Sequence, residues 1–172
     1  MRRMVPRGKL RRLVFGHSAG IAGTVYGTII VMATIAAGAR TAEDHPWELA
    51  AAVAVSVIVL WIAHVYSNTL AESLQRGRRL DVAEFRALAR HELAMPGAAI
   101  APVAALVLGA LEVLAIRTAI WLALGLGVAT LAVQGARYAA LERLSRPATV
   151  VSIALNVFLG LVIVVLKALI AH

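Results

Sequence analysis

The chain has 172 residues, of which 61% are apolar and only 15% are charged. Ordinary soluble domains are about 45–50% apolar and about 25% charged, and a small domain buries too little surface to hide such an excess. The composition argues against a soluble globular protein and favours one membrane domain over residues 1–172. There is no cysteine, which excludes disulfides, thiolate metal ligands and a thiol nucleophile.

The charge balance is strongly basic, with 17 Lys and Arg against 9 Asp and Glu and a formal charge of +8. Such a balance is typical either of nucleic-acid binding or of contact with anionic lipid headgroups. The basic residues flank long neutral runs. We therefore expect the lipid bilayer as partner, with anionic headgroups at the cytoplasmic face, and no nucleic acid.

Five mostly apolar runs are long enough to cross a bilayer, which takes about 20 such residues. They are residues 14–39, 47–71, 94–116, 118–138 and 148–170. None shows the period-two alternation of a membrane barrel strand. Only helices and closed barrels satisfy every backbone group in hydrocarbon, so the predicted fold class is all-α: a polytopic integral membrane bundle of five transmembrane helices.

The distribution of Lys and Arg predicts the orientation of these helices. Fourteen of the 17 lie before the first run, between the second and third, or around the loop after the fourth; the other three are Arg40, Arg117 and Lys167. Positive charge concentrates on the cytoplasmic side of membrane proteins. The amino terminus is therefore predicted to be cytoplasmic and the carboxyl terminus outside, in a multi-pass protein of the cell membrane.

A hydrophilic stretch, residues 72–92, separates the second and third runs. Asp81 followed by Glu84 has the spacing of a capping box, which predicts a short helix over residues 81–93. At 100° per residue, one stripe of that helix combines basic and apolar side chains: Arg79, Arg86 and Arg90 beside Val82, Phe85 and Ala89. This pattern predicts an amphipathic helix at the membrane surface, with the three arginines as a cytoplasmic basic surface.

Polar side chains recur inside the predicted helices near their cytoplasmic ends. At 1.5 Å per residue, four of them lie at a depth of roughly 6–12 Å: Thr24, His64, Gln134 and Asn156. On the second helix, Asn68 and Glu72 continue the polar stripe at four-residue steps toward the cytoplasm. Because unpaired buried polar groups cost free energy, residues at one depth are expected to pair. We interpret the six as a cytoplasm-facing polar vestibule or ion path centred on His64.

Two interpretations of these polar residues stay open. They can be interhelical hydrogen bonds, each worth about 0.6 kcal/mol. Alternatively, they form a functional site, since ionisable residues inside a span mark function and histidine changes charge near neutral pH. At the end of the short helix, His91 and Glu92 are interpreted as a solvated helix end. The alternative there is that they collect a cation together with Glu72.

Small residues recur at four-residue steps on two of the predicted helices. They are Gly16 and Gly20, Gly23 and Gly27, and the series Gly97, Ala101, Ala105 and Gly109. Such ridges let helix backbones approach closely in lipid. We favour packing within the chain, with a seam between copies of a homo-oligomer as the alternative.

Enzymatic motifs are absent from the sequence. There is no phosphate-binding glycine loop with its lysine, no pair of carboxylates in one span and no His-Glu-x-x-His run. One histidine with neutral neighbours does not make a metal site. We therefore expect no enzyme activity, no cofactor and no metal centre.

The first predicted helix reads RRLVFGHSAGIAGTVYG over residues 11–27. It resembles the first helix of vacuolar-iron-transporter-like proteins, in which a Gly-x-x-Asp-Gly-hydrophobic-x-Ser/Thr pattern follows a basic stretch. Gly16, Gly20 and Ile21 match this pattern, and the resemblance implies five spans with a cytoplasmic segment between the second and third. Ala19 stands where that family has its aspartate, so no metal-site residue is carried over.

Two functions from different classes fit these observations. The first is a transporter or channel for a small cation or proton that uses the vestibule around His64. The second is a non-transporting membrane anchor or assembly subunit that binds a partner through the arginine-rich loop. The sequence favours the first by a small margin, because an ionisable residue inside a span is functional by default.

Overall fold

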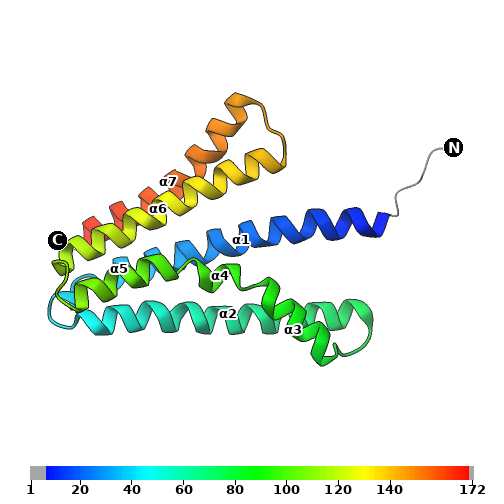
Figure 1. The fold of residues 1–172 in the computed structure, drawn as a ribbon, viewed down its shortest axis with the longest axis horizontal. Helices are drawn as coiled ribbons and strands as arrows, with labels where there is room; N and C mark the ends of the chain where they lie inside the picture. Colours follow the sequence, from blue (N-terminus) through cyan, green and yellow to red (C-terminus); the bar gives the residue numbers. More distant parts are fainter. Residues whose placement is uncertain (1–6, 171–172) are drawn as a thin grey trace.

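The computed structural model describes residues 7–170, with side chains from residue 20 onward apart from Glu43, Lys167 and Ile170. Its elements are α1 (Arg7–Gly38), the 3-10 turn η1 (Thr41–Glu43), α2 (Pro46–Arg76), α3 (Val82–His91), α4 (Ala94–Gly97), α5 (Ile100–Ala110), α6 (Ile116–Leu141) and α7 (Arg146–Ile170). The long helices run back and forth between the two ends of an elongated bundle (Figure 1). The all-α prediction is confirmed.

Four described helical segments are long and apolar enough to cross a membrane: Gly20–Gly38 of α1, all of α2 and α6, and Arg146–Leu166 of α7. A fifth candidate is the series from α3 to α5, which bends by 48° between Val82–Gly97 and Ile100–Ala110. Large apolar side chains on the outside of α7, among them Val150, Leu155 and Phe158, are exposed. Exposed apolar surface on this scale is typical of a membrane protein.

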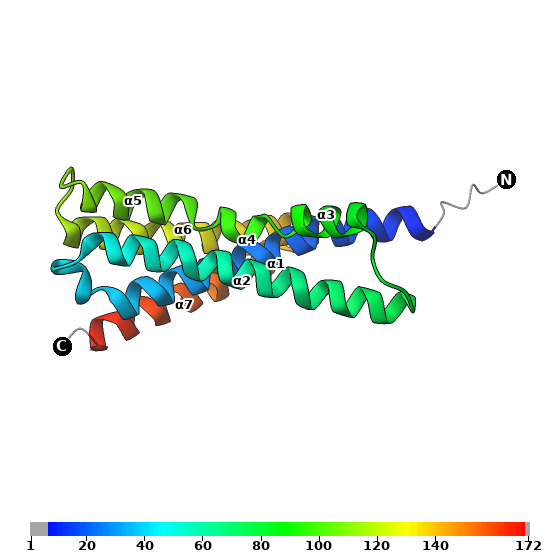
Figure 2. The ribbon, with the colours of Figure 1, turned by 90° about the horizontal axis from the view of Figure 1, so that it is seen from below.

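The arginine-rich segments gather at one end of the bundle. The start of α1, the turn from α2 to α3 and the turn from α6 to α7 lie toward that end, while η1, the turn from α5 to α6 and the end of α7 lie at the other (Figures 1 and 2). This arrangement follows from the alternating direction of the long helices.

The predicted run 94–116 is interrupted near its start, and the prediction of one continuous helix is wrong. The turn at 98–99 separates α4 from α5 within this run, and the turn at 92–93, just before the run, separates α3 from α4. The first residue of each turn lies four residues before a proline, Pro96 or Pro102. Proline has no N–H to donate to the carbonyl four residues back, and its ring clashes with that carbonyl. The backbone therefore turns at both positions.

The same run also ends earlier than predicted. α5 stops at Ala110, and the five residues before α6 form a tight turn in which Glu112 has φ 60°. A left-handed conformation is uncommon for a residue other than glycine. Glu112 is exposed there, outside any helix.

α4 packs against α1 at glycine positions. A Cβ built on Gly27 would collide with the carbonyl oxygen of Met95, and one on Gly23 would lie 3.6 Å from the backbone nitrogen of Met95. At the other end of the bundle, a Cβ on Gly109 would lie 2.6 Å from the Cβ of Ala119, where α5 meets α6. These predicted small-residue ridges therefore serve close packing within the chain.

Other small residues of the ridges have no such neighbour. A Cβ on Gly97 would meet no described atom within 4 Å, and Ala101 is exposed. Gly16 lies in the part of α1 whose side chains are not described. A homo-oligomer seam on α5 stays a prediction.

Candidate functional site

Glu92 is the centre of the candidate site. It occupies the turn between α3 and α4 and is only 6% exposed, whereas its neighbour His91 is exposed. The interpretation of Glu92 as a solvated helix end is therefore wrong. At this turn, four residues before Pro96, the carbonyl of Glu92 accepts from the amide of Met95, and the Glu92 side chain lies inside the bundle.

Two side chains of α2 contact the Glu92 carboxylate. Asn68 Nδ2 donates a hydrogen bond to Oε1 at 3.1 Å, and His64 Nε2 lies 3.4 Å from Oε2. His64 and Asn68 are four residues apart, so they stand one above the other on the same face of the helix. The predicted polar stripe on α2 thus meets a carboxylate that comes from a separate segment.

α1 closes the other side of the site with small residues and one aromatic ring. A Cβ on Gly23 would lie 3.9 Å from Glu92 Oε2, so the absence of a side chain leaves room beside the carboxylate. The ring of Tyr26 lies 6.5 Å from the ring of His64, centroid to centroid, at an interplanar angle of 36°. Together these elements enclose a partly open cavity of about 590 Å³, lined by Ala22, Gly23, Tyr26, His64, Asn68, Glu92 and Met95.

Among the described side chains, His64 is the one basic group that lies next to the Glu92 carboxylate. No Lys or Arg among the described side chains is paired with Glu92. A buried charge costs free energy unless it is paired and hydrogen-bonded, and the hydrogen bond from Asn68 is neutral. A positively charged group beside the carboxylate would supply this pairing, and the cavity leaves space for one.

The structure brings only part of the predicted vestibule to this cavity. His64 and Asn68 line it, while Thr24 Oγ1 donates to the carbonyl of its own helix at Gly20, at 2.8 Å. Glu72 lies one turn beyond Asn68 and pairs with Arg76 at 2.6 Å near the end of α2. Glu72 thus belongs to a separate charged cluster.

Gln134 and Asn156 belong to the contact between α6 and α7. Gln134 Oε1 accepts from Arg137 Nη1 at 3.4 Å, and Asn156 Nδ2 donates to the carbonyl of Ser152 at 3.0 Å. Ser152 in turn donates to the carbonyl of Gly135 at 3.0 Å. Gln134 and Asn156 each bond within their own helix, so the expected interhelical hydrogen bonds of these two residues are not formed among the described side chains, and Ser152 makes the bond that joins α6 and α7.

Sequence reasoning missed Tyr26 and misplaced Glu92. The signal for Glu92 was Pro96, because a proline four residues after an acidic residue turns the backbone at that residue. Tyr26 carried a weaker signal, its position one turn from Gly23 on the glycine-rich face of α1.

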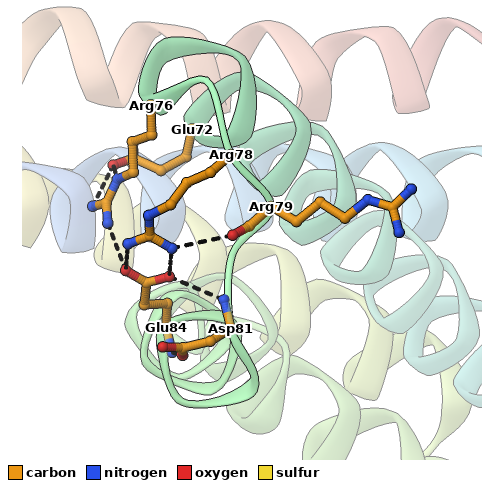
Figure 3. A network of polar contacts seen from close by, with 6 residues as sticks. All are labelled: Glu72, Arg76, Arg78, Arg79, Asp81 and Glu84. Carbon is orange, nitrogen blue, oxygen red and sulfur yellow. Dashed lines mark hydrogen bonds and ion pairs between the residues drawn. The ribbon is translucent and has the colours of Figure 1, made fainter.

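A clip of charged residues joins the end of α2 to the start of α3 (Figure 3). The predicted capping box is confirmed: the Glu84 amide donates to Asp81 Oδ1 at 2.8 Å, and the Asp81 amide donates to Glu84 Oε2 at 3.0 Å. Arg78 contacts both oxygens of Glu84, at 2.7 and 2.9 Å, and Arg76 bridges Glu84 to Glu72. The hydrogen bonds from Arg78 and the Asp81 amide lower the pKa of Glu84 to about 2.

The three arginines of the predicted basic surface are not part of this clip through their side chains. Arg79, Arg86 and Arg90 are all exposed, and the side chain of Arg79 points away from the clip (Figure 3). Beside them, Val82 is 66% and Phe85 43% exposed, and no residue of α3 is buried. The described chain thus leaves the three arginines, Val82 and Phe85 uncovered, while Leu88 and Ala89 are partly buried.

Comparison of the chain with protein-family models, curated proteins and solved structures gives no match. The resemblance of the first helix to vacuolar-iron-transporter-like proteins therefore stays a prediction from the sequence. Function has to be argued from the site itself.

Proposed function

We propose that this chain is a cell-membrane protein of five spans, with its amino terminus in the cytoplasm, that moves a small cation or proton through the bilayer. The observation that supports it best is the buried Glu92 carboxylate, which faces His64 and Asn68 in a cavity of about 590 Å³. In this proposal the spans are α1, α2, α4 with α5, α6 and α7, and the three arginine-rich segments lie together in the cytoplasm, in agreement with the usual location of positive charge.

The position of the cavity along α2 supports this proposal. His64 lies seven residues, or about 10 Å, from the cytoplasmic end of the predicted run 47–71. Ionisable residues at such a depth are expensive and mark ion or proton paths. In transporters, interrupted helices line the binding sites. The turns around α4 supply such an interruption next to Glu92.

Proton flux into liposomes tests the proposal. The purified full chain is reconstituted with a pH-sensitive dye inside, and flux is compared with that of Glu92→Gln and His64→Ala. We expect each variant to lose at least about tenfold in flux, since general acid–base groups contribute roughly 10²–10⁴-fold to proton transfer. Glu142→Gln is the matched control, because Glu142 is an exposed carboxylate just after α6. Equal flux in all four proteins would refute the proposal.

The exposed face of α3 favours a second function, a non-transporting anchor or assembly subunit. Its uncovered arginines and apolar side chains suit an acidic partner protein or anionic headgroups. Pull-down from membranes with Arg79, Arg86 and Arg90 all changed to Gln should lose the partner. The matched control changes the exposed Arg143 and Arg146 of the α6–α7 turn. Equal recovery with both sets of changes would exclude the α3 surface.

A further inference from the structure

We infer that the cavity around Glu92 binds an organic ammonium group, either a protonated amine or a quaternary ammonium, in preference to a bare metal cation. This inference rests on the proposed function and names the class of its substrate. Three features of the cavity carry it: its single negative charge, its size with few ligand atoms, and its aromatic wall.

The charge of the cavity matches one monovalent cation. Among the described side chains, Glu92 is the single carboxylate that lines it, and Asn68 Nδ2 donates a hydrogen bond to that carboxylate. The described charged or titratable side chains around the carboxylate are Tyr26 on α1 and His64 on α2. With His64 neutral, an ammonium group compensates the buried charge of Glu92. A protonated amine also donates hydrogen bonds to the carboxylate oxygens, whereas a quaternary ammonium attracts them by its charge alone.

The size and ligand set of the cavity do not suit a bare metal ion. Ca²⁺ and Mg²⁺ take six or more oxygen ligands at about 2.0–2.6 Å. The described part of the chain contains no group of three or more His, Cys, Asp or Glu side chains that could hold a metal. The volume, about 590 Å³, has room for a carbon skeleton as well as its charged group.

The walls of the cavity suit the carbon substituents of such a cation. Tyr26 presents an aromatic ring, and aromatic faces attract cations within about 6 Å, quaternary ammonium groups above all. Ala22, Gly23 and Met95 supply an otherwise apolar surface. Met is flexible and polarizable, so it adapts to ligands of irregular shape.

The ammonium group has two possible sources, a soluble amine or the headgroup of an ethanolamine or choline lipid. Both present the same chemistry to Glu92 and Tyr26. The proposed depth of the cavity, close to the cytoplasmic headgroups, gives access to either source. The experiment therefore uses a probe of each kind.

Isothermal titration calorimetry of the full chain in detergent tests the inference, with benzyltrimethylammonium as the soluble probe and dihexanoyl-phosphatidylcholine, below its micelle concentration, as the lipid probe. We expect at least one probe to bind. Glu92→Gln should weaken that binding at least tenfold, and Tyr26→Leu by about threefold or more, the size of a cation–π contact. Glu142→Gln and Tyr138→Leu are the matched controls, since both side chains are exposed near the end of α6. They should bind as the unchanged protein does.

Three results would overturn the inference: neither probe binds, Glu92→Gln binds as tightly as the unchanged protein, or Tyr26→Leu has no effect. Circular dichroism and gel filtration show whether each variant is folded, and Glu92→Gln keeps the size of the side chain it replaces. The probe that binds identifies the source of the ammonium group. Proton flux without binding of either probe would overturn this inference alone, whereas binding of a probe without proton flux would overturn proton transport alone.

Discussion

Replacing Gly27 with alanine tests the contact between α1 and α4 that holds the candidate site in place. The new Cβ would fall on the carbonyl oxygen of Met95, 3.1 Å from its carbonyl carbon and 3.2 Å from its Cα. These are backbone atoms, so no change of rotamer relieves the contact. Ordinary carbon–carbon separations of about 3.5–4.0 Å require α4 to move away from α1 by roughly 0.5–1 Å.

The expected loss of stability follows from two opposed terms. Overpacking costs typically about 1–3 kcal/mol, and alanine in a helix regains about 0.5–1 kcal/mol relative to glycine. The net loss for Gly27→Ala is at most about 2.5 kcal/mol, and the middles of the two ranges give about 1.2 kcal/mol. For a chain of 150–250 residues each kcal/mol lowers the Tm by about 2–4 °C, so the Tm should fall by about 2–5 °C.

Thermal unfolding in detergent, followed by circular dichroism, measures this shift. Gly125→Ala is the matched control, because a Cβ on Gly125, in the middle of α6, would meet no described atom within 4 Å. Its Tm should stay equal or rise, since only the helix-propensity term acts. A Gly27→Ala protein that melts together with Gly125→Ala, or above it, would refute the packing of α4 on α1.

Two further predictions concern other contacts of the structure. Ser152→Ala removes the bond to the carbonyl of Gly135 and should lower the free energy of unfolding by about 1 kcal/mol; an unchanged Tm would contradict it. The pKa of Glu84 is lowered from 4.5 to about 2 by its contacts in the clip. The ionised Glu84 carboxylate therefore stabilises the clip fully above pH 4.5, and this stabilisation is lost as the pH falls toward 2. Spin labels at Gln75 and Ala83 should therefore keep their distance from pH 7 to 5 and separate near pH 2, and separation already at pH 5 would exclude the clip.

The fold class and the surface helix follow from local sequence signals. Long neutral runs bounded by arginines indicate helices whatever their partners, and the capping box of Asp81 and Glu84 depends on residues three apart. The break at 98–99 in the third run was also encoded locally, by Pro102. A hydropathy window averages over this proline, so the run appeared continuous.

The site could be predicted only in part, because depth along a helix does not give direction around it. His64 and Asn68 were found, since residues four apart share a face of α2. Gln134 and Asn156 have the same depth but take their hydrogen bonds within α6 and α7. Glu92 reaches His64 through a turn from another segment, and such a contact between distant segments depends on the tertiary packing.

Glu92 lies in a turn between two helices and not within a continuous helix. In a straight helix the direction of a side chain is fixed by 100° steps from its neighbours. At the turn before α4 the 100° rule no longer applies. The direction of the Glu92 side chain there depends on the turn before Pro96 and on the close packing of α4 against the glycines of α1. A helical-wheel search for intramembrane acids would therefore overlook residues of this kind, which become visible once prolines are read together with the side chain four positions upstream.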